Sequence, residues 1–338
     1  MRHFWQHLKP PFFVLAPMAD VTDVVFRHFV LRYSRPEVVY TEFMATKALL
    51  ARTIPASLRQ ALSFSESERP IVAQVFGAEP AEMFASAQLI RRLGFDGMDI
   101  NMGCPDRRVE RHGAGAALIR DPSRAQALIQ AAKAGLDGLP LSVKTRIGYH
   151  SMETAAWIGA VLAAQPDVLV LHGRTRQELS AVPAHWDEIA LAARLAHDAG
   201  VLCVGNGDIH SREQGEDYAR RFGVDGVMIG RGVFGNPWVF APHADRSEAE
   251  KLQALADLIT QFSGFWQTTK NDQSLKKHFK AYVAGFPSSP ALCGRLLASR
   301  SAGEAIDTLA AYFHHQGWPF PEPVYRPTPE PLIHATHA

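Results

Sequence analysis

Short apolar runs alternate with longer amphipathic segments along most of the chain. Eight of the apolar runs have the length of a buried strand and are followed by turn residues. These strand candidates span residues 12–17, 38–43, 71–76, 97–102, 141–147, 168–172, 201–205 and 226–230. Most of the segments between them carry apolar residues three or four positions apart, which predicts amphipathic helices. The predicted helices span residues 81–93, 123–136, 154–164, 186–199 and 211–222.

This alternation of strands and helices is typical of α/β folds. About eight βα units in succession predict a (β/α)8 TIM barrel, which we expect over residues 1–242. An open doubly wound sheet is the alternative, although such sheets usually have fewer strands.

The pattern changes near Pro242, after which strand candidates are absent from the sequence. Four helices are predicted over residues 248–267, 275–285, 291–299 and 304–316. We therefore expect a small all-α helical domain over residues 246–318. The last segment, 319–338, is rich in proline and is expected to be an extended tail that is poorly ordered at its end.

Composition narrows the class of protein only slightly. Hydrophobic residues make up 47% of the chain and charged residues 20%, as in ordinary soluble proteins. No run of 18 apolar residues predicts a membrane span, and the N-terminus lacks the apolar core of a signal peptide. Three widely spaced cysteines indicate neither a disulfide framework nor a C-x-x-C metal site, so we expect no metal and a reducing, cytoplasmic location. The net charge of +1 favours no class of partner.

The residues at the ends of the predicted strands should face one rim, where barrels place their chemistry, and most of them are polar residues, prolines or glycines. These positions are Pro17, Met18, Ala19, Glu42, Gln74, Asn101, Cys104, Lys144, Arg146, His172, Asn206, Gly207, Asp208, Gly230 and Arg231. Each could be structural by itself: Lys144 could form an interior ion pair, and His172 could be a core histidine. Since buried polar groups without partners are costly, so many on one rim indicate a site.

Two glycine-bearing turns, residues 205–209 and 229–232, follow the last two predicted strands. Glycine lets the backbone approach an anion closely, and backbone N–H groups with an arginine can bind it. The loops after the seventh and eighth strands are a common phosphate site of TIM barrels, so we favour this interpretation over ordinary tight turns.

Cys104 lies between a glycine and a proline, directly after the fourth predicted strand. This position predicts a turn, whereas Cys203 and Cys293 are more typical of small buried hydrophobic residues. A thiol on such a turn can be a nucleophile or a proton donor, and the two roles need opposite protonation states.

Several motifs together resemble those of the tRNA-dihydrouridine synthases. They are residues 15–23, the Asn-Met-Gly-Cys-Pro turn at 101–105, and residues 143–146, 171–175, 205–209 and 230–232. Residues 275–297 are similar to part of the family's C-terminal helical domain. The resemblance implies an FMN-containing TIM barrel that reduces the C5–C6 double bond of specific uridines in tRNA, with electrons from NADPH.

The resemblance also implies roles for individual residues. Hydride would pass from flavin N5 to C6 of the uracil, and Cys104 would protonate C5 as general acid. Asn101 would help to position the flavin or the uracil. The implied flavin contacts are Pro17, Met18, Ala19, Gln74, Lys144, His172, Asn206, Gly207, Asp208, Gly230 and Arg231.

Local charge supports tRNA as a partner. Residues 270–300 contain six basic residues and one acidic residue. Within this stretch Lys276, Lys277 and Lys280 are candidates for RNA contacts, as are Arg107 and Arg146 near the Cys104 turn. A solvated charged surface is the ordinary alternative. We expect a monomer and no membrane partner.

Three other functions stay open on the residues alone. The first is a flavin-dependent barrel that acts on a free pyrimidine, as in dihydroorotate oxidation. The second is a barrel that only binds RNA. The third is an aldolase-like enzyme that forms a Schiff base on Lys144.

Overall fold

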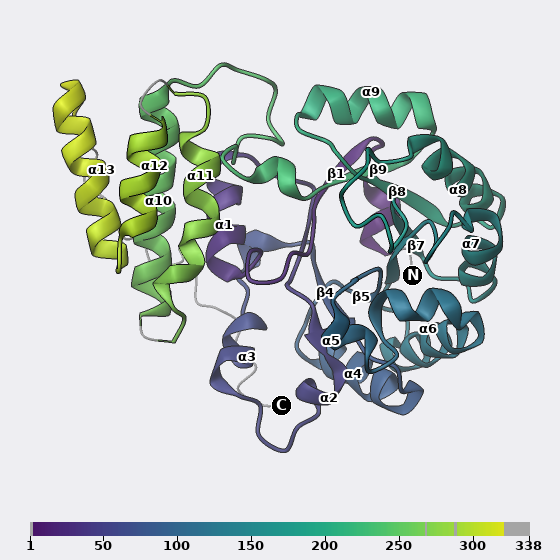
Figure 1. Ribbon diagram of the computed structural model, residues 1–338. Coiled ribbons are helices and arrows are strands. Elements are labelled where there is room, and N and C mark those ends of the chain that lie inside the picture. The colour runs from purple at the N-terminus through teal and green to yellow at the C-terminus, as the bar shows by residue number, and fades with distance from the viewer. Residues whose placement is uncertain (1–2, 268, 287–288, 321–338) are drawn as a thin grey trace.

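The computed structural model describes residues 3–267, 269–286 and 289–320 (Figure 1). Its centre is a closed barrel of parallel strands. These strands are β1 (Phe12–Leu15), β2 (Val38–Tyr40), β4 (Ile71–Phe76), β5 (Gly97–Met102), β6 (Leu141–Arg146), β7 (Val168–His172), β8 (Leu202–Asn206) and β9 (Gly226–Ile229). Neighbours in sequence pair with one another, and β9 pairs with β1 to close the barrel. The short strand β3 (Met44–Ala45) pairs with the carboxyl end of β4. The predicted TIM barrel is therefore confirmed.

Helices surround the barrel, as Figure 1 shows. They are α1 (Val24–Tyr33), α4 (Pro80–Arg92), α6 (Pro122–Leu136), α7 (Thr154–Ala163), α8 (Trp186–Asp198) and α9 (Arg212–Phe222). Short helical segments lie in the loops, namely α2 (Thr46–Leu49), α3 (Ala56–Ala61), α5 (Arg107–Glu110), η2 (Glu66–Glu68), η3 (Gly115–Arg120) and η4 (Arg231–Val233), and η1 (Phe4–His7) precedes β1. The five helices predicted between strands are all present, and α1 is an addition. Six of the ten residues of α1 are buried, including Arg27, so the helix lacks the polar face that an amphipathic pattern requires.

Within the described residues, four α-helices and a short 3₁₀ helix follow the barrel. They are α10 (Glu248–Trp266), η5 (Asp272–Leu275), α11 (Lys276–Val283), α12 (Ser289–Ala298) and α13 (Ala302–Gln316). In Figure 1 the four α-helices lie side by side on one flank of the barrel, with α1 between them and the strands. The side chain of Ser247 caps α10 by accepting a hydrogen bond from the Glu250 N–H, and Glu250 bonds back to Ser247. The four helices predicted here are thus present, whereas residues 321–338 of the predicted tail lie outside the described residues.

The interior of the barrel has an apolar floor and a polar top. The floor includes the buried side chains Val14, Tyr40, Val72, Val170, Val204 and Met228, together with Trp5 of η1. Alternate residues of the same strands face outward and pack against the helices in a second cluster. Toward the carboxyl ends of the strands, polar side chains such as Gln74, Asn101 and Asn206 replace the apolar ones. This change places the chemistry of the chain at one mouth of the barrel.

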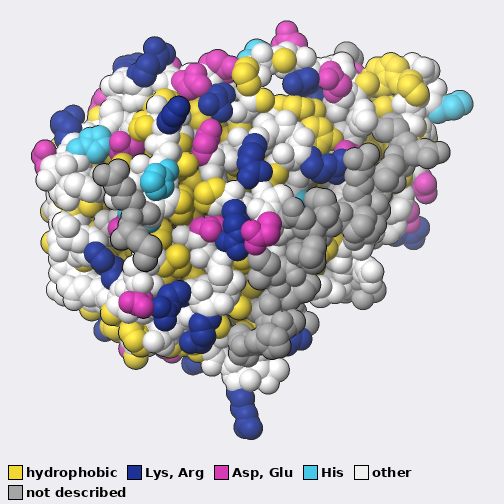
Figure 2. Space-filling model, turned by 180° about the vertical axis from the view of Figure 1, so that it is seen from behind, with side chains coloured by type: hydrophobic (Ala, Val, Ile, Leu, Met, Phe, Trp, Pro, Cys, Tyr) yellow, Lys and Arg dark blue, Asp and Glu magenta, His cyan; other side chains and the backbone are white. Residues whose placement is uncertain are grey.

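The surface mixes both signs of charge. On the face seen in Figure 2, Lys and Arg side chains are interspersed with Asp and Glu among the described residues. No helix in the described part of the chain is long and apolar enough to cross a membrane.

Candidate functional site

Two adjoining cavities lie at the carboxyl ends of the strands. The larger has a volume of about 390 Å³ and the smaller about 200 Å³. Pro17, Met18, Lys144, Arg146 and His172 line both cavities, so the two are parts of one site.

The structure brings together the residues that the sequence singled out at the strand ends. The larger cavity is lined by Asn206, Gly207, Asp208, Gly230 and Arg231, besides the shared residues. The smaller is lined by Ala19, Gln74, Asn101 and Cys104, again with the shared residues. The location follows from the fold, because all parallel strands of a barrel end at the same rim.

The turn that carries Cys104 is held from both sides. Asn101 Oδ1 accepts hydrogen bonds from the N–H groups of Gly103, at 3.1 Å, and Cys104, at 2.9 Å. On the other side, the Ala116 N–H donates to the Cys104 carbonyl at 3.0 Å. Gly115 makes this approach possible: its φ is +62°, and a Cβ there would lie 2.7 Å from the Cys104 carbonyl oxygen. Gly115 therefore lets the backbone come close enough to form the hydrogen bond that supports the turn.

The environment of Cys104 favours a neutral thiol. Burial raises the pKa of the thiol above its ordinary value, although a backbone hydrogen bond at Asp106 lowers it. A thiol that stays protonated is a better proton donor than nucleophile. Of the two roles left open by the sequence, the structure thus supports proton donation.

Arg146 also holds the Cys104 turn, through hydrogen bonds to backbone carbonyls. Its Nε donates to the Gly103 carbonyl at 2.8 Å, and its Nη1 donates to the carbonyls of Thr175 and Leu179, both at 3.1 Å. Burial lowers the pKa of Arg146 to about 10. Two nitrogens of Arg146 therefore donate to backbone carbonyls. The sequence, which made Arg146 a candidate for RNA contacts, had not indicated this structural role.

Lys144 and Asn206 form a fixed polar pair across the mouth. The Lys144 Nζ donates to Asn206 Oδ1 at 3.1 Å, while Asn206 Nδ2 donates to the Met228 carbonyl at 2.8 Å. Burial and the charge of Arg146 lower the pKa of Lys144 to about 8. Since both ends of the Asn206 amide are engaged, its orientation is defined by its neighbours.

His172 is held as a neutral imidazole. Burial lowers its pKa well below the ordinary value, and the positive charges of Arg146, Lys144, Arg174 and Arg231 lower it further. Arg174 Nη1 lies 3.2 Å from His172 Nε2. Because a guanidinium can only donate, Nε2 accepts this bond and the ring proton is on Nδ1.

Asp208 joins the basic residues of the larger cavity. It accepts hydrogen bonds from Arg174, at 2.5 Å, and from Arg231, at 3.1 Å. Burial raises the pKa of Asp208, but the hydrogen bond and charge of Arg174 outweigh this effect and hold the pKa low. With two arginines on one carboxylate, this end of the cavity keeps positive charge for an anion.

The glycines of the last two loops leave room at this end. Gly207 has φ +141°, and a Cβ there would lie 2.5 Å from Ala184 Cβ. At Gly230 the nearest atoms to an added Cβ are Ala16 Cβ, at 3.5 Å, and Met18 Sδ, at 3.7 Å. These two residues line the larger cavity, so a side chain at Gly230 would take up space inside it. The loops therefore fit a phosphate group held by backbone N–H groups and Arg231.

The basic residues considered for RNA contacts lie at different places. Arg107 is exposed on α5, directly after the Cys104 turn. Lys277 of α11 is exposed and donates through Nζ to the Asp20 carbonyl, in the loop after β1. Lys280 is exposed on the same helix, and Lys276 is half-buried. α11 thus reaches the rim of the barrel through Lys277.

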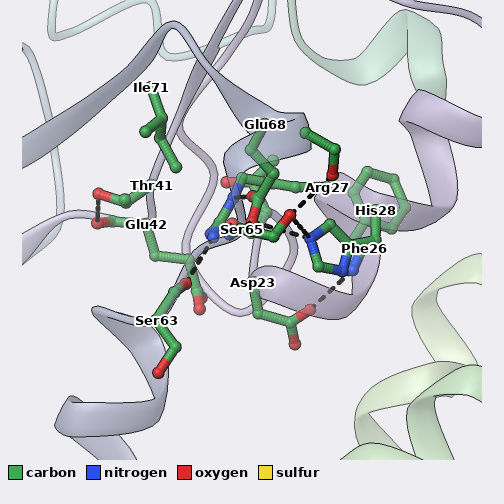
Figure 3. Close-up of polar contacts among 12 residues, drawn as sticks. Asp23, Phe26, Arg27, His28, Thr41, Glu42, Ser63, Ser65, Glu68 and Ile71 are labelled. Atoms are coloured by element: carbon green, nitrogen blue, oxygen red, sulfur yellow. Dashed lines mark hydrogen bonds and ion pairs between the residues drawn. The ribbon is translucent and has the colours of Figure 1, made fainter. Parts of the chain in front are cut away.

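Asp23 of the 15–23 motif and Lys270 of the basic stretch connect this rim with the helices, a contact that the sequence did not indicate. Asp23 Oδ1 caps α1 by accepting from the Phe26 N–H at 3.0 Å, as Figure 3 shows. Its Oδ2 accepts from Trp266 Nε1, at 3.1 Å, and from Lys270 Nζ, at 2.7 Å. The capping position of Asp23 was the only local signal, because its other partners are more than 240 residues away in sequence. In the described part of the chain, no group of three His, Cys, Asp or Glu residues could hold a metal ion.

Comparisons with known proteins cover both parts of the chain. Residues 14–289 match the family described as dihydrouridine synthase. The "probable tRNA-dihydrouridine synthase" of Staphylococcus aureus is 40% identical over 308 residues, which are 90% of this chain and 93% of that protein. The "probable tRNA-dihydrouridine synthase 2" of Bacillus subtilis is 41% identical over 309 residues, 89% of this chain and 94% of that protein.

Proposed function

Because the chain belongs to the dihydrouridine synthase family, we propose that it reduces the C5–C6 double bond of specific uridines in tRNA, with FMN as cofactor and NADPH as reductant. One observation carries this proposal. Cys104, with its raised pKa, lines a cavity that continues into a basic, glycine-lined pocket suited to a phosphate. A proton donor next to a phosphate-bearing cofactor is what the reduction of a double bond by hydride and proton requires.

The residues at the mouth fit FMN. Gly207, Gly230 and Arg231 would hold its phosphate, because the glycine loops and the arginine leave a positively charged space there. The rest of the cofactor would contact Pro17, Met18, Ala19, Gln74, Lys144, His172, Asn206 and Asp208. Once reduced by NADPH, FMN would supply the hydride for C6 of the uracil.

Cys104 would donate its proton to C5 of the uracil, which leaves a thiolate. Arg146 lowers the pKa of this thiol through its charge, and a negative charge on Cys104 raises the pKa of Lys144 and of Arg146. The two cations therefore stabilise the thiolate that proton transfer leaves behind. Burial keeps the proton on the thiol beforehand, and the cations lower the cost of losing it.

The target base would enter the smaller cavity after leaving its stack, as RNA bases must before they reach such a pocket. Asn101 lines this cavity beside Cys104. Arg107 next to the turn would contact the RNA backbone, together with Lys276, Lys277 and Lys280 on α11. Since phosphate contacts release counterions, binding should weaken strongly with salt.

The test is Cys104→Ala in the full chain. Dihydrouridine formation in tRNA, measured by mass spectrometry of nucleosides, should fall by about 10²–10⁴-fold, while FMN remains bound and NADPH still reduces it. Cys293→Ala, at a half-buried cysteine of α12, is the matched control and should keep its activity.

Full activity of Cys104→Ala would show that another group is the general acid. Protein that holds no flavin and takes up none from solution, yet binds tRNA, would refute the cofactor and favour an RNA-binding function. RNA-independent reduction of free pyrimidines would favour the dihydroorotate-type alternative.

A further inference from the structure

A chain of hydrogen bonds runs through the barrel interior and ends at the Cys104 turn. It starts on β2 with Tyr40, whose hydroxyl lies 2.9 Å from Ser142 Oγ on β6. Ser142 Oγ donates to Asp99 Oδ1 on β5 at 2.6 Å, and Gln74 Nε2 on β4 donates to Asp99 Oδ2 at 2.7 Å. Asn101 Nδ2 then donates to Gln74 Oε1 at 3.0 Å. Four neighbouring strands are thereby joined around one buried carboxyl group.

The direction of each bond follows from Asp99. Both oxygens of Asp99 accept hydrogen bonds, Oδ1 from Ser142 and Oδ2 from Gln74, so the nitrogen of the Gln74 amide faces Asp99 and its oxygen faces Asn101. The Asn101 amide is thereby turned so that its nitrogen donates to Gln74. Its oxygen is left to accept from the backbone N–H groups of Gly103 and Cys104. The orientation of two amides beside the cavity thus follows from a single acceptor oxygen below them.

We propose that Asp99 is a positioning residue, which holds the Cys104 turn and the amides of Gln74 and Asn101 in the orientation that the reaction uses. Its effect on catalysis rests on the proposed function, whereas its effect on the turn does not. Asp99 touches neither cavity and acts only through Gln74.

A stabilising role alone is a poor explanation for a carboxyl group at this place. Asp99 is 0% exposed, and burial raises its pKa to about 7, against the lowering effects of Ser142, Gln74 and Lys144. Lys144 on β6 and Tyr40 on β2 are the titratable groups that act on it electrostatically. Burying a charge costs stability, and an apolar side chain would avoid this cost, as Val72 and Val170 do in the same barrel.

The chain of hydrogen bonds divides into two arms at Asp99, so an effect on positioning can be separated from an effect on packing. The upper arm, through Gln74 and Asn101, reaches Cys104, whereas the lower arm, through Ser142, ends at Tyr40. Asp99→Ala removes the acceptor of both arms and leaves a small cavity. Ser142→Ala interrupts only the lower arm, and Val170→Ala leaves a cavity without a change in hydrogen bonding.

Asp99→Asn tests whether the acceptor oxygen is what matters. The asparagine oxygen can still accept from Gln74 while its nitrogen faces Ser142. The Ser142 hydroxyl can then turn to the Met98 carbonyl, 3.5 Å away. The amide should therefore rescue what the alanine loses.

Two quantities are compared on the flavin-loaded full chain, in a Cys293→Ser background: the alkylation rate of Cys104 by iodoacetamide and the kcat for tRNA, with KM determined from the same kinetics. In Asp99→Ala the alkylation rate should rise by about threefold or more, because Gln74 and Asn101 lose their fixed orientation and the Asn101 contact to the turn loosens. The kcat should fall by about tenfold or more, with little change in KM. Asp99→Asn, Ser142→Ala and Val170→Ala should stay near the wild-type values of both quantities.

The proposal is overturned if Asp99→Ala behaves like Val170→Ala in both measurements, or if Asp99→Asn is as impaired as Asp99→Ala. If the wild type forms no dihydrouridine, the proposed function fails, and the alkylation comparison alone decides the positioning role. If Asp99→Ala does not fold, Gln74→Met interrupts the upper arm one step higher and should raise the alkylation rate equally; an unchanged rate overturns the proposal.

Discussion

Replacing Arg27 by methionine should destabilise the protein by a measurable amount. Arg27 of α1 and Glu68 of η2 form an ion pair in which both side chains are 0% exposed, with Nε 2.5 Å from Oε2 (Figure 3). The guanidinium also donates to the carbonyls of Thr22, at 3.1 Å, and Ser63, at 2.9 Å. These bonds join the loop after β1 to the segment that precedes β4. Arg27→Met keeps most of the buried volume and removes the guanidinium from Glu68, whose remaining ionisable partner is His28, with Nε2 2.9 Å from Oε1.

Removing one partner of a buried pair costs about 3–5 kcal/mol. Unfolding entropy is about 2.1 cal/mol/K per residue, which is roughly 0.7 kcal/mol/K for 338 residues. The expected fall in Tm is therefore about 4–7 °C. Burial raises the pKa of Glu68, and at present the charge of Arg27 and the bond to His28 outweigh that effect. Without Arg27, Glu68 should take up a proton at higher pH, so the loss in Tm should be smaller at pH 5 than at pH 8.

The assay is calorimetric unfolding at both pH values. Arg300→Met is the matched control, because its pair with Glu304 is exposed and should contribute little. The double variant Arg27→Met, Glu68→Leu should recover most of the Tm, since no buried charge remains. The reasoning is refuted if Arg27→Met lowers Tm no more than Arg300→Met does.

Three further predictions concern pH, cofactor and RNA. Burial lowers the pKa of His278 to about 3, so its contribution to stability is present above the unfolded-state value of about 6.5 and is lost as pH falls below it. His278→Phe should flatten the fall of Tm between these values, and an unchanged slope would contradict the assignment. Gly230→Ala should weaken FMN binding, since its Cβ would enter the cavity. Gly207→Ala should weaken FMN binding and also lower Tm, because φ is +141° there. Flavin titration measures the first effect, and thermal unfolding of the flavin-free protein measures the second. Arg107→Ala should reduce the slope of log K against log salt for tRNA by about 0.7–0.9, measured by filter binding, and an equal slope would exclude a phosphate contact.

Much of the framework was predictable from local pattern. The strands near Cys104, Lys144 and His172 follow from short apolar runs that end in turns, and closing them into a barrel brings their ends to one rim. α1 was missed because Arg27, a charged residue, lies in its buried face, where the pattern leads one to expect an apolar side chain.

The sequence by itself determined the barrel, the rim of polar strand ends and the thiol on a turn, because each is encoded by neighbours along the chain. Only the tertiary structure decided the protonation state of these groups and the partners of their hydrogen bonds. Whether Cys104 is protonated depends on burial, and the orientation of Gln74 depends on Asp99, 25 residues away in sequence. Lys270 donates a hydrogen bond to Asp23, which is 247 residues away in sequence. Electrostatics and hydrogen bonding act over a few ångströms of space, so they are decided by strand register and packing, which local pattern does not specify.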